Sequence, residues 1–122
     1  MKNNCFLILF VFLILLSCQN EEKWYPSTDV TIASQYEYND PSTLKKQIFV
    51  TCVVHNTSNT TINSGAVTFQ VKTDKREYLQ TIAINTRIIP SGKIAVNAVI
   101  AYLDNTEQVK PNGVIIYSSY FD

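Results

Sequence analysis

Hydrophobic and polar residues alternate along most of the chain after residue 27. The alternation is clearest in two segments, whose apolar members are Val30, Ile32, Tyr36 and Tyr38 in the first and Ile94, Val96, Ala98, Ile100 and Tyr102 in the second. A period of two is typical of a β-strand with one apolar face. We therefore predict two strands, with each apolar set on a single face.

Four further segments predict strands, and short polar segments separate them. Residues 48–55 are apolar almost without interruption, as expected of a central strand with both faces covered. The other strands are predicted over 66–72, 78–84 and 114–121, and turns over 39–42, 56–61, 73–76, 89–93 and 110–113. In the turn that begins at Ile89, Pro90 in second place and Gly92 in fourth suit type I geometry.

Signals for helices are nearly absent from this part of the chain. Branched Ile, Val and Thr dominate, and no apolar set recurs with a period of 3.6 residues. Many short antiparallel strands in one stretch of chain are typical of two packed sheets. The sequence predicts an all-β domain over residues 28–122, a β-sandwich of about seven antiparallel strands.

The first 18 residues have the pattern of a cleavable export signal. The short polar start with Lys2 precedes an apolar run from Cys5 to Leu16. Twelve residues of helix extend only about 18 Å, which is too short for a hydrocarbon core of about 30 Å. The run is therefore predicted to be a signal sequence rather than a membrane span.

The segment Leu15-Leu16-Ser17-Cys18 resembles the lipobox of bacterial lipoproteins. That resemblance implies a signal peptide over residues 1–17 and lipid attachment to the Cys18 thiol, the side chain best suited to this chemistry as a nucleophile. It also implies a lipid bilayer as partner, because two or more acyl chains make membrane attachment stable. Residues 18–27 are then a tether to the folded domain.

The residues after Cys18 bear on the location of the protein. Gln19 stands where Asp tends to retain Gram-negative lipoproteins at the inner membrane, so the resemblance implies lipid anchoring at the outer membrane. The segment 19–22 also resembles the acidic surface-export signal of Bacteroidota lipoproteins. Exposure on the cell surface and a position on the periplasmic side both remain open.

Charge and residue chemistry exclude several classes of function. Removal of Lys2 with the signal leaves nine basic and ten acidic residues, without a basic patch that would favour nucleic acid as a partner. Cys52 lies in an apolar strand and is predicted to be buried, and His55 has no nearby ligand set for a metal. Glycine-rich phosphate loops and a nucleophile elbow are missing. We predict no catalytic residues, no metal site and no cofactor.

A second resemblance covers roughly residues 45–103. A strand followed by Asn56-Thr57-Ser58, with a later Ile-Pro-Ser-Gly-Lys turn at 89–93, resembles the FxLYD-type immunoglobulin-like domains of bacterial envelope proteins. The namesake motif departs from the family pattern, because the segment 69–74 has an extra residue and lacks the Tyr. The resemblance implies that the β-sandwich is immunoglobulin-like and that it is a non-catalytic module for binding or scaffolding.

Three functions follow as hypotheses. The first is an interaction module that binds an envelope protein or a glycan, through its loops or through an edge strand. The alternative is an inhibitor or immunity lipoprotein that blocks a toxin or a cell-wall hydrolase. A hydrolase is the third, and His55 is the residue that it would require.

Overall fold

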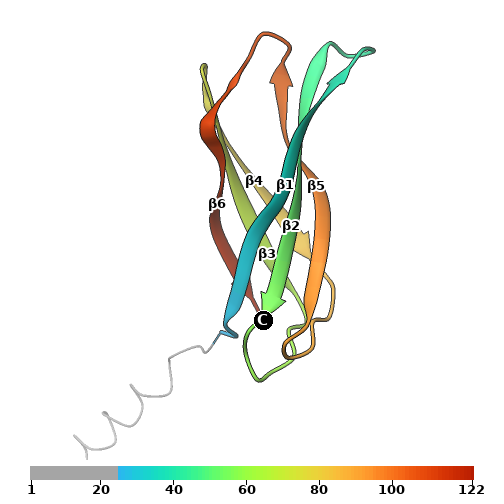
Figure 1. Ribbon diagram of the computed structural model, residues 1–122, viewed down its shortest axis with the longest axis vertical. Helices are drawn as coiled ribbons and strands as arrows, with labels where there is room; N and C mark the ends of the chain where they lie inside the picture. The colour runs from blue at the N-terminus through green and yellow to red at the C-terminus, as the bar shows by residue number, and fades with distance from the viewer. Residues whose placement is uncertain (1–24) are drawn as a thin grey trace, which may run out of the picture.

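The computed structural model describes residues 25–122, which fold into six antiparallel strands in two sheets (Figure 1). The strands are β1 (Thr28–Asp40), β2 (Lys45–Asn56), β3 (Gly65–Thr73), β4 (Glu77–Ile84), β5 (Lys93–Asp104) and β6 (Val109–Phe121). The strand order is β1-β2-β5 in one sheet and β4-β3-β6 in the other. The predicted all-β class is confirmed for these residues.

The number of strands is lower than the predicted seven. Four of the strands contain 12 or 13 residues, so six strands use most of the described chain. A single bridge between Ile62 and Ile88 is the only further pairing within residues 25–122. This part of the chain also contains no helix long and apolar enough to cross a membrane.

The core lies between the inner faces of the two sheets. Every second residue of β2 and β3 is buried, since successive side chains of a strand point to opposite faces. The buried apolar residues are Ile48, Val50, Cys52, Val54, Ile62, Val67, Phe69, Val71, Ile84, Ile88, Ile100, Ala101, Leu103, Val114 and Phe121. One shared core between two sheets is the arrangement of a β-sandwich.

The outer face of β2 differs from its prediction. The strand is central in its sheet, as predicted, but only one of its faces packs against the other sheet. Phe49, Thr51, Val53 and His55 on the opposite face are half-buried and are shielded only by neighbouring strands. This outer face of β2, which contains both apolar and polar residues, is therefore partly open to solvent.

Two predicted turns also differ in detail. The amide of Gly92 donates to the carbonyl of Ile89, but Ser91 has a φ of 65°, which is type II rather than type I geometry. Residues 110–113 lie within β6 as a bulge between the pairs Thr73–Val109 and Val71–Val114. Asn112 reaches the necessary curvature with a φ of 54°.

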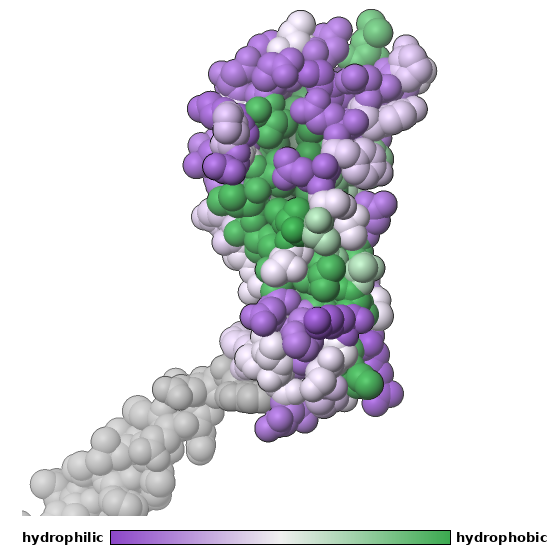
Figure 2. All heavy atoms as spheres, viewed as in Figure 1, coloured by the Kyte–Doolittle hydropathy of each residue, from purple (hydrophilic) through white to green (hydrophobic). Residues whose placement is uncertain are grey.

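The strands place the two groups of loops at opposite ends of the molecule. The lower end in Figure 1 holds the start of β1, the C-terminus and the loops 57–64 and 85–92. The upper end holds the three connections 41–44, 74–76 and 105–108. In the same view, hydrophobic residues form a band along the long axis where β1 and β6 lie next to each other (Figure 2).

Candidate binding face

A bulge in β1 turns two tyrosines away from the core. Ile32 pairs with Cys52 and Ser34 pairs with Thr51, so Ala33 is an extra residue without a partner. One extra residue moves all following side chains to the other face of a strand. Val30 and Ile32 therefore pack against the core, whereas Tyr36 and Tyr38 lie on the outer face. The prediction of one face for this set is wrong for this reason.

A second bulge, in β5, turns Tyr102 away from the core in the same way. Phe49 pairs with Val99 and Ile48 with Ala101, so Ile100 is the extra residue. Ile94 and Val96 pack on the core before the bulge, and Tyr102 lies on the outer face after it. The alternation that predicts one face from Ile94 to Tyr102 is therefore wrong at its last member.

The two bulges build one continuous outer surface on the sheet β1-β2-β5, which we term the aromatic face. It consists of four transverse rows, each with one residue from β1, β2 and β5. The rows are Tyr38-Gln47-Tyr102, Tyr36-Phe49-Val99, Ser34-Thr51-Asn97 and Thr31-Val53-Ala95. On β2, which has no extra residue here, the six-residue step from Gln47 to Val53 at about 3.3 Å per residue gives the face a length of about 20 Å.

The aromatic rings of this face are well exposed. Tyr36 and Tyr38 expose 50% of their surface and Tyr102 exposes 59%. The ring of Tyr36 lies parallel to that of Phe49, with 4.9 Å between the ring centroids. This stack holds Tyr36 in a fixed orientation, so the ring is arranged before any ligand arrives.

Charged residues border the aromatic face but do not enter it. The row above it is Asp40-Lys45-Asp104, and the row below it is Asp29-His55-Lys93. None of the twelve side chains between these two rows is charged. The face therefore suits an uncharged partner that offers apolar surface and hydrogen-bonding groups.

The two residues considered for chemistry lie on opposite faces of β2. His55 is half-buried in the lower border row, between Asp29 and Lys93. Cys52 is buried among the core residues, and burial raises the pKa of its thiol, which makes the thiol unreactive. Among residues 25–122, no three His, Cys, Asp or Glu residues come close enough together to hold a metal ion.

A buried carboxylate fastens the loops at the upper end. The fully buried Glu107 side chain accepts hydrogen bonds from Thr73 Oγ1 at 2.6 Å, from Tyr78 Oη at 2.9 Å and from the Arg76 guanidinium at 3.2 and 3.3 Å. The amide of Asp104 donates to it as well, at 3.2 Å. Glu107 therefore joins the loop between β5 and β6 to the hairpin of β3 and β4.

Hydrogen bonding decides the charge of this carboxylate. Burial alone raises the pKa of Glu107, but the hydrogen bonds from Thr73, Arg76, Tyr78 and the Asp104 amide lower it more strongly, to about 2. The side chain is therefore charged at neutral pH and is fully used by its neighbours. The sequence alone does not predict this structural role of Glu107, because its partner Thr73 lies 34 residues away in the chain.

A buried amide fastens the loops at the lower end. The side chain of Asn56 donates to the carbonyls of Thr60 and Ile88 and accepts from the amide and hydroxyl of Ser58. Its backbone pairs with Gly92 and Ser91. The Asn-Thr-Ser motif, which reads as a polar turn in the sequence, is therefore an internal clamp in which Asn56 and Ser58 are buried and Thr57 is exposed.

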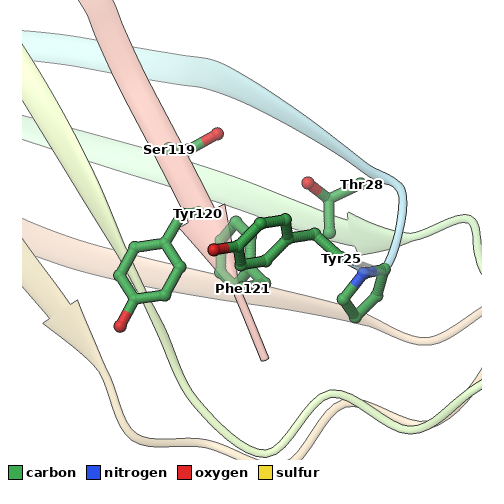
Figure 3. A pocket seen from close by; sticks show the side chains of 6 residues that line it. Tyr25, Thr28, Ser119, Tyr120 and Phe121 are labelled. Carbon is green, nitrogen blue, oxygen red and sulfur yellow. The ribbon is translucent and has the colours of Figure 1, made fainter. Parts of the chain in front are cut away.

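A small pocket of about 400 Å³ lies at the lower end, between the start of β1 and the end of β6 (Figure 3). Its lining residues are Tyr25, Pro26, Thr28, Ser119, Tyr120 and Phe121. The rings of Tyr25 and Tyr120 meet edge to face, with 6.3 Å between their centroids. This ring contact therefore holds the segment just before β1 against the end of β6.

Two predicted features lie wholly or partly outside the described residues. Cys18, the predicted lipid attachment site, and the signal over 1–17 precede residue 25. Of the predicted tether 18–27, only residues 25–27 are described. Comparison of the sequence with protein-family models and with curated proteins finds no match.

Proposed function

We propose that this protein is a membrane-anchored bacterial lipoprotein of the outer membrane, whose β-sandwich is a non-catalytic module that binds an envelope protein or glycan. The observation that carries this proposal is the aromatic face, where Tyr36, Tyr38 and Tyr102 are exposed on one uncharged surface. Tyrosine is enriched in binding surfaces because its rigid ring offers much contact area at a low cost in conformational entropy.

The strand order supports an immunoglobulin-like architecture. In such domains, strands A, B and E share one sheet, and strands C and F share the other, with C′ added in the variable type. The orders β1-β2-β5 and β4-β3-β6 correspond to A-B-E and C′-C-F. Strand D, which joins A, B and E in immunoglobulin domains, and the last strand G have no counterpart in the described residues. Domains of this architecture bind ligands on a sheet face or at the loops. In this protein, hydrogen bonds to Glu107 and Asn56 fix the loops.

The number of residues after Cys18 limits how far each end of the sandwich lies from the proposed anchor. Seven residues separate Cys18 from Tyr25, a reach of at most about 25 Å, so the lower end of the sandwich stays close to the bilayer. The partners of Thr28 and Tyr38 on β2 are Asn56 and Gln47, which are nine residues apart, so Tyr38 lies about 30 Å further up the sheet. The upper half of the aromatic face is therefore the part of this surface that lies furthest along the strands from the end nearest the proposed anchor.

The anchor is tested by comparing the wild type with Cys18→Ala in the bacterium that makes the protein. We expect the wild type to have the mass of an acylated chain that begins at Cys18 and to partition with membranes. The variant should lack the acyl mass. A wild type that is soluble and cleaved elsewhere would overturn the lipoprotein proposal.

The binding face is tested by photocrosslinking in the same cells. A photoreactive amino acid at Tyr102 probes the aromatic face, and one at Leu79 is the matched control, because Leu79 is equally exposed at 58% on the opposite sheet. We expect a discrete crosslinked envelope species from position 102 and none from position 79. Equal crosslinking from both positions, or none from either, would overturn the proposed face.

A further inference from the structure

We infer that the ligand of the aromatic face is an uncharged glycan that lies across the strands and stacks on Tyr36, Tyr38 and Tyr102. This inference rests on the proposed function and names the chemical class of the partner. It follows from three properties of the face: the spacing of its rings, the polar side chains between them, and the charge-free area around them.

Aromatic rings recognise sugars through the apolar side of the pyranose. Its C–H bonds carry partial positive charge, and the face of an aromatic ring carries partial negative charge, so the two stack favourably. Tyr38 and Tyr102 lie in one row with β2 between them, two strand spacings or about 9.6 Å apart. Tyr36 is two residues from Tyr38 along β1, or about 6.7 Å. Tyrosine rings at these spacings suit stacking on neighbouring sugar rings of one extended glycan.

Amide side chains lie among the rings. Gln47 is half-buried between Tyr38 and Tyr102, and Asn97 is exposed two rows below. Within the described part of the chain, neither amide makes a side-chain hydrogen bond. An amide both donates and accepts, as a sugar hydroxyl does, so these groups can select the hydroxyl pattern of a stacked sugar.

The absence of charged side chains from the aromatic face favours a neutral glycan over charged polymers as the ligand. Single-stranded nucleic acids also stack on aromatic side chains, but their binding grooves are positively charged to match the phosphates. The aromatic face has no charged side chain in its four rows, and its borders carry three Asp against two Lys and His55. A neutral glycan needs no counter-charge, and this agrees with the composition of the face.

The test uses the full lipidated chain, solubilised in detergent, on an array of neutral polysaccharides (glucans, mannans, xylans and chitin) and of anionic ones (polygalacturonate and hyaluronate). We expect binding to at least one neutral polymer, with an affinity that is nearly the same at low and high salt. Tyr36→Ala and Tyr102→Ala should each weaken binding by about tenfold, the equivalent of one lost stacking contact. Leu79→Ala, on the opposite sheet, should leave the affinity unchanged.

Other outcomes overturn the inference in distinct ways. Binding to anionic polymers alone, with loss at high salt, would show an electrostatic surface instead. Binding that is indifferent to Tyr36→Ala and Tyr102→Ala would place the glycan elsewhere. If no polymer binds while crosslinking at position 102 captures a protein, the glycan inference falls and the proposed function stands. If both experiments fail, both proposals fall.

Discussion

Tyr38 and Tyr102 lie in the same transverse row of one sheet, on its two outer strands, with Gln47 between them. A bulge lies between Tyr38 and the core-facing Ile32 in β1, and another lies between Tyr102 and the core-facing Val96 in β5. Bulges change the direction of side chains and are common near functional sites. Here two independent bulges, at Ala33 and Ile100, bring three tyrosines to the same outer face. A surface built in this way is difficult to explain by core packing alone.

The stack of Tyr36 on Phe49 predicts a measurable coupling between the two rings. Parallel aromatic pairs across strands contribute about 0.5 to 1.5 kcal/mol beyond the burial of their area. In a double-mutant cycle with Tyr36→Ala, Phe49→Ala and the double variant, we expect a coupling free energy of about 1 kcal/mol from urea unfolding. The control is a second cycle in which Tyr117→Ala takes the place of Tyr36→Ala and is combined with Phe49→Ala. Tyr117 exposes 59% of its surface on β6, and this cycle should give a coupling near zero.

The sequence predicted the class of the fold well and the binding face poorly. Alternation and turn residues predicted the six observed strands, because these signals are local. The faces of Tyr36 and Tyr102 were predicted wrongly, because a bulge depends on pairing with β2, and a single strand carries no sign of that register. The roles of Glu107 and Asn56 were missed for a similar reason, since their partners lie up to 34 residues away in the chain. In the sequence, the only signal for these two roles is a charged or amide residue in a segment that the fold buries.

Replacement of Glu107 by Gln should destabilise the protein. The variant keeps the shape of the side chain but loses the charge that accepts from Arg76, Thr73 and Tyr78. Because a buried network then lacks an acceptor, we expect a loss of about 2 to 4 kcal/mol in the free energy of unfolding. Asp104→Asn is the matched control. It removes the half-exposed partner of the same arginine and should cost less than about 1 kcal/mol.

The lowered pKa of Glu107 also predicts a dependence on acid. The folded pKa of about 2 lies below the ordinary value of 4.5, so the folded state favours the charged form. Its contribution to stability is therefore complete above about pH 4.5 and is lost as the pH falls toward 2, by about 3 kcal/mol in total. Urea unfolding from pH 7 to pH 2 should show this loss in the wild type. The Glu107→Gln variant should show a smaller decline over the same range, and an identical decline would contradict the assignment.

Replacement of Asn56 by Asp should loosen the lower end of the sandwich. The carboxylate can still accept from Ser58, but it cannot donate to the carbonyls of Thr60 and Ile88. These buried acceptors then face a negative charge, and we expect a loss of about 2 to 4 kcal/mol. Asn59→Asp, at an exposed position in the same loop, should change stability by less than about 0.5 kcal/mol. Hydrogen exchange should rise at residues 57–62 and 88–92 in the first variant only.

Replacement of Gly65 by Ala should disturb the end of β6. A Cβ atom at this position would overlap the ring of Phe121 and would lie 2.5 Å from the carbonyl oxygen of Tyr120. Phe121 is buried with only 2% of its surface exposed, so its ring has little space to move. Overpacking of this kind costs about 1 to 3 kcal/mol. Thermal unfolding should show the loss in Gly65→Ala, and Gly65→Ala combined with Phe121→Leu should lose less than the sum of the two single variants. Strict additivity would show that the ring does not meet the new methyl group, and that Gly65 serves the backbone of β6 instead.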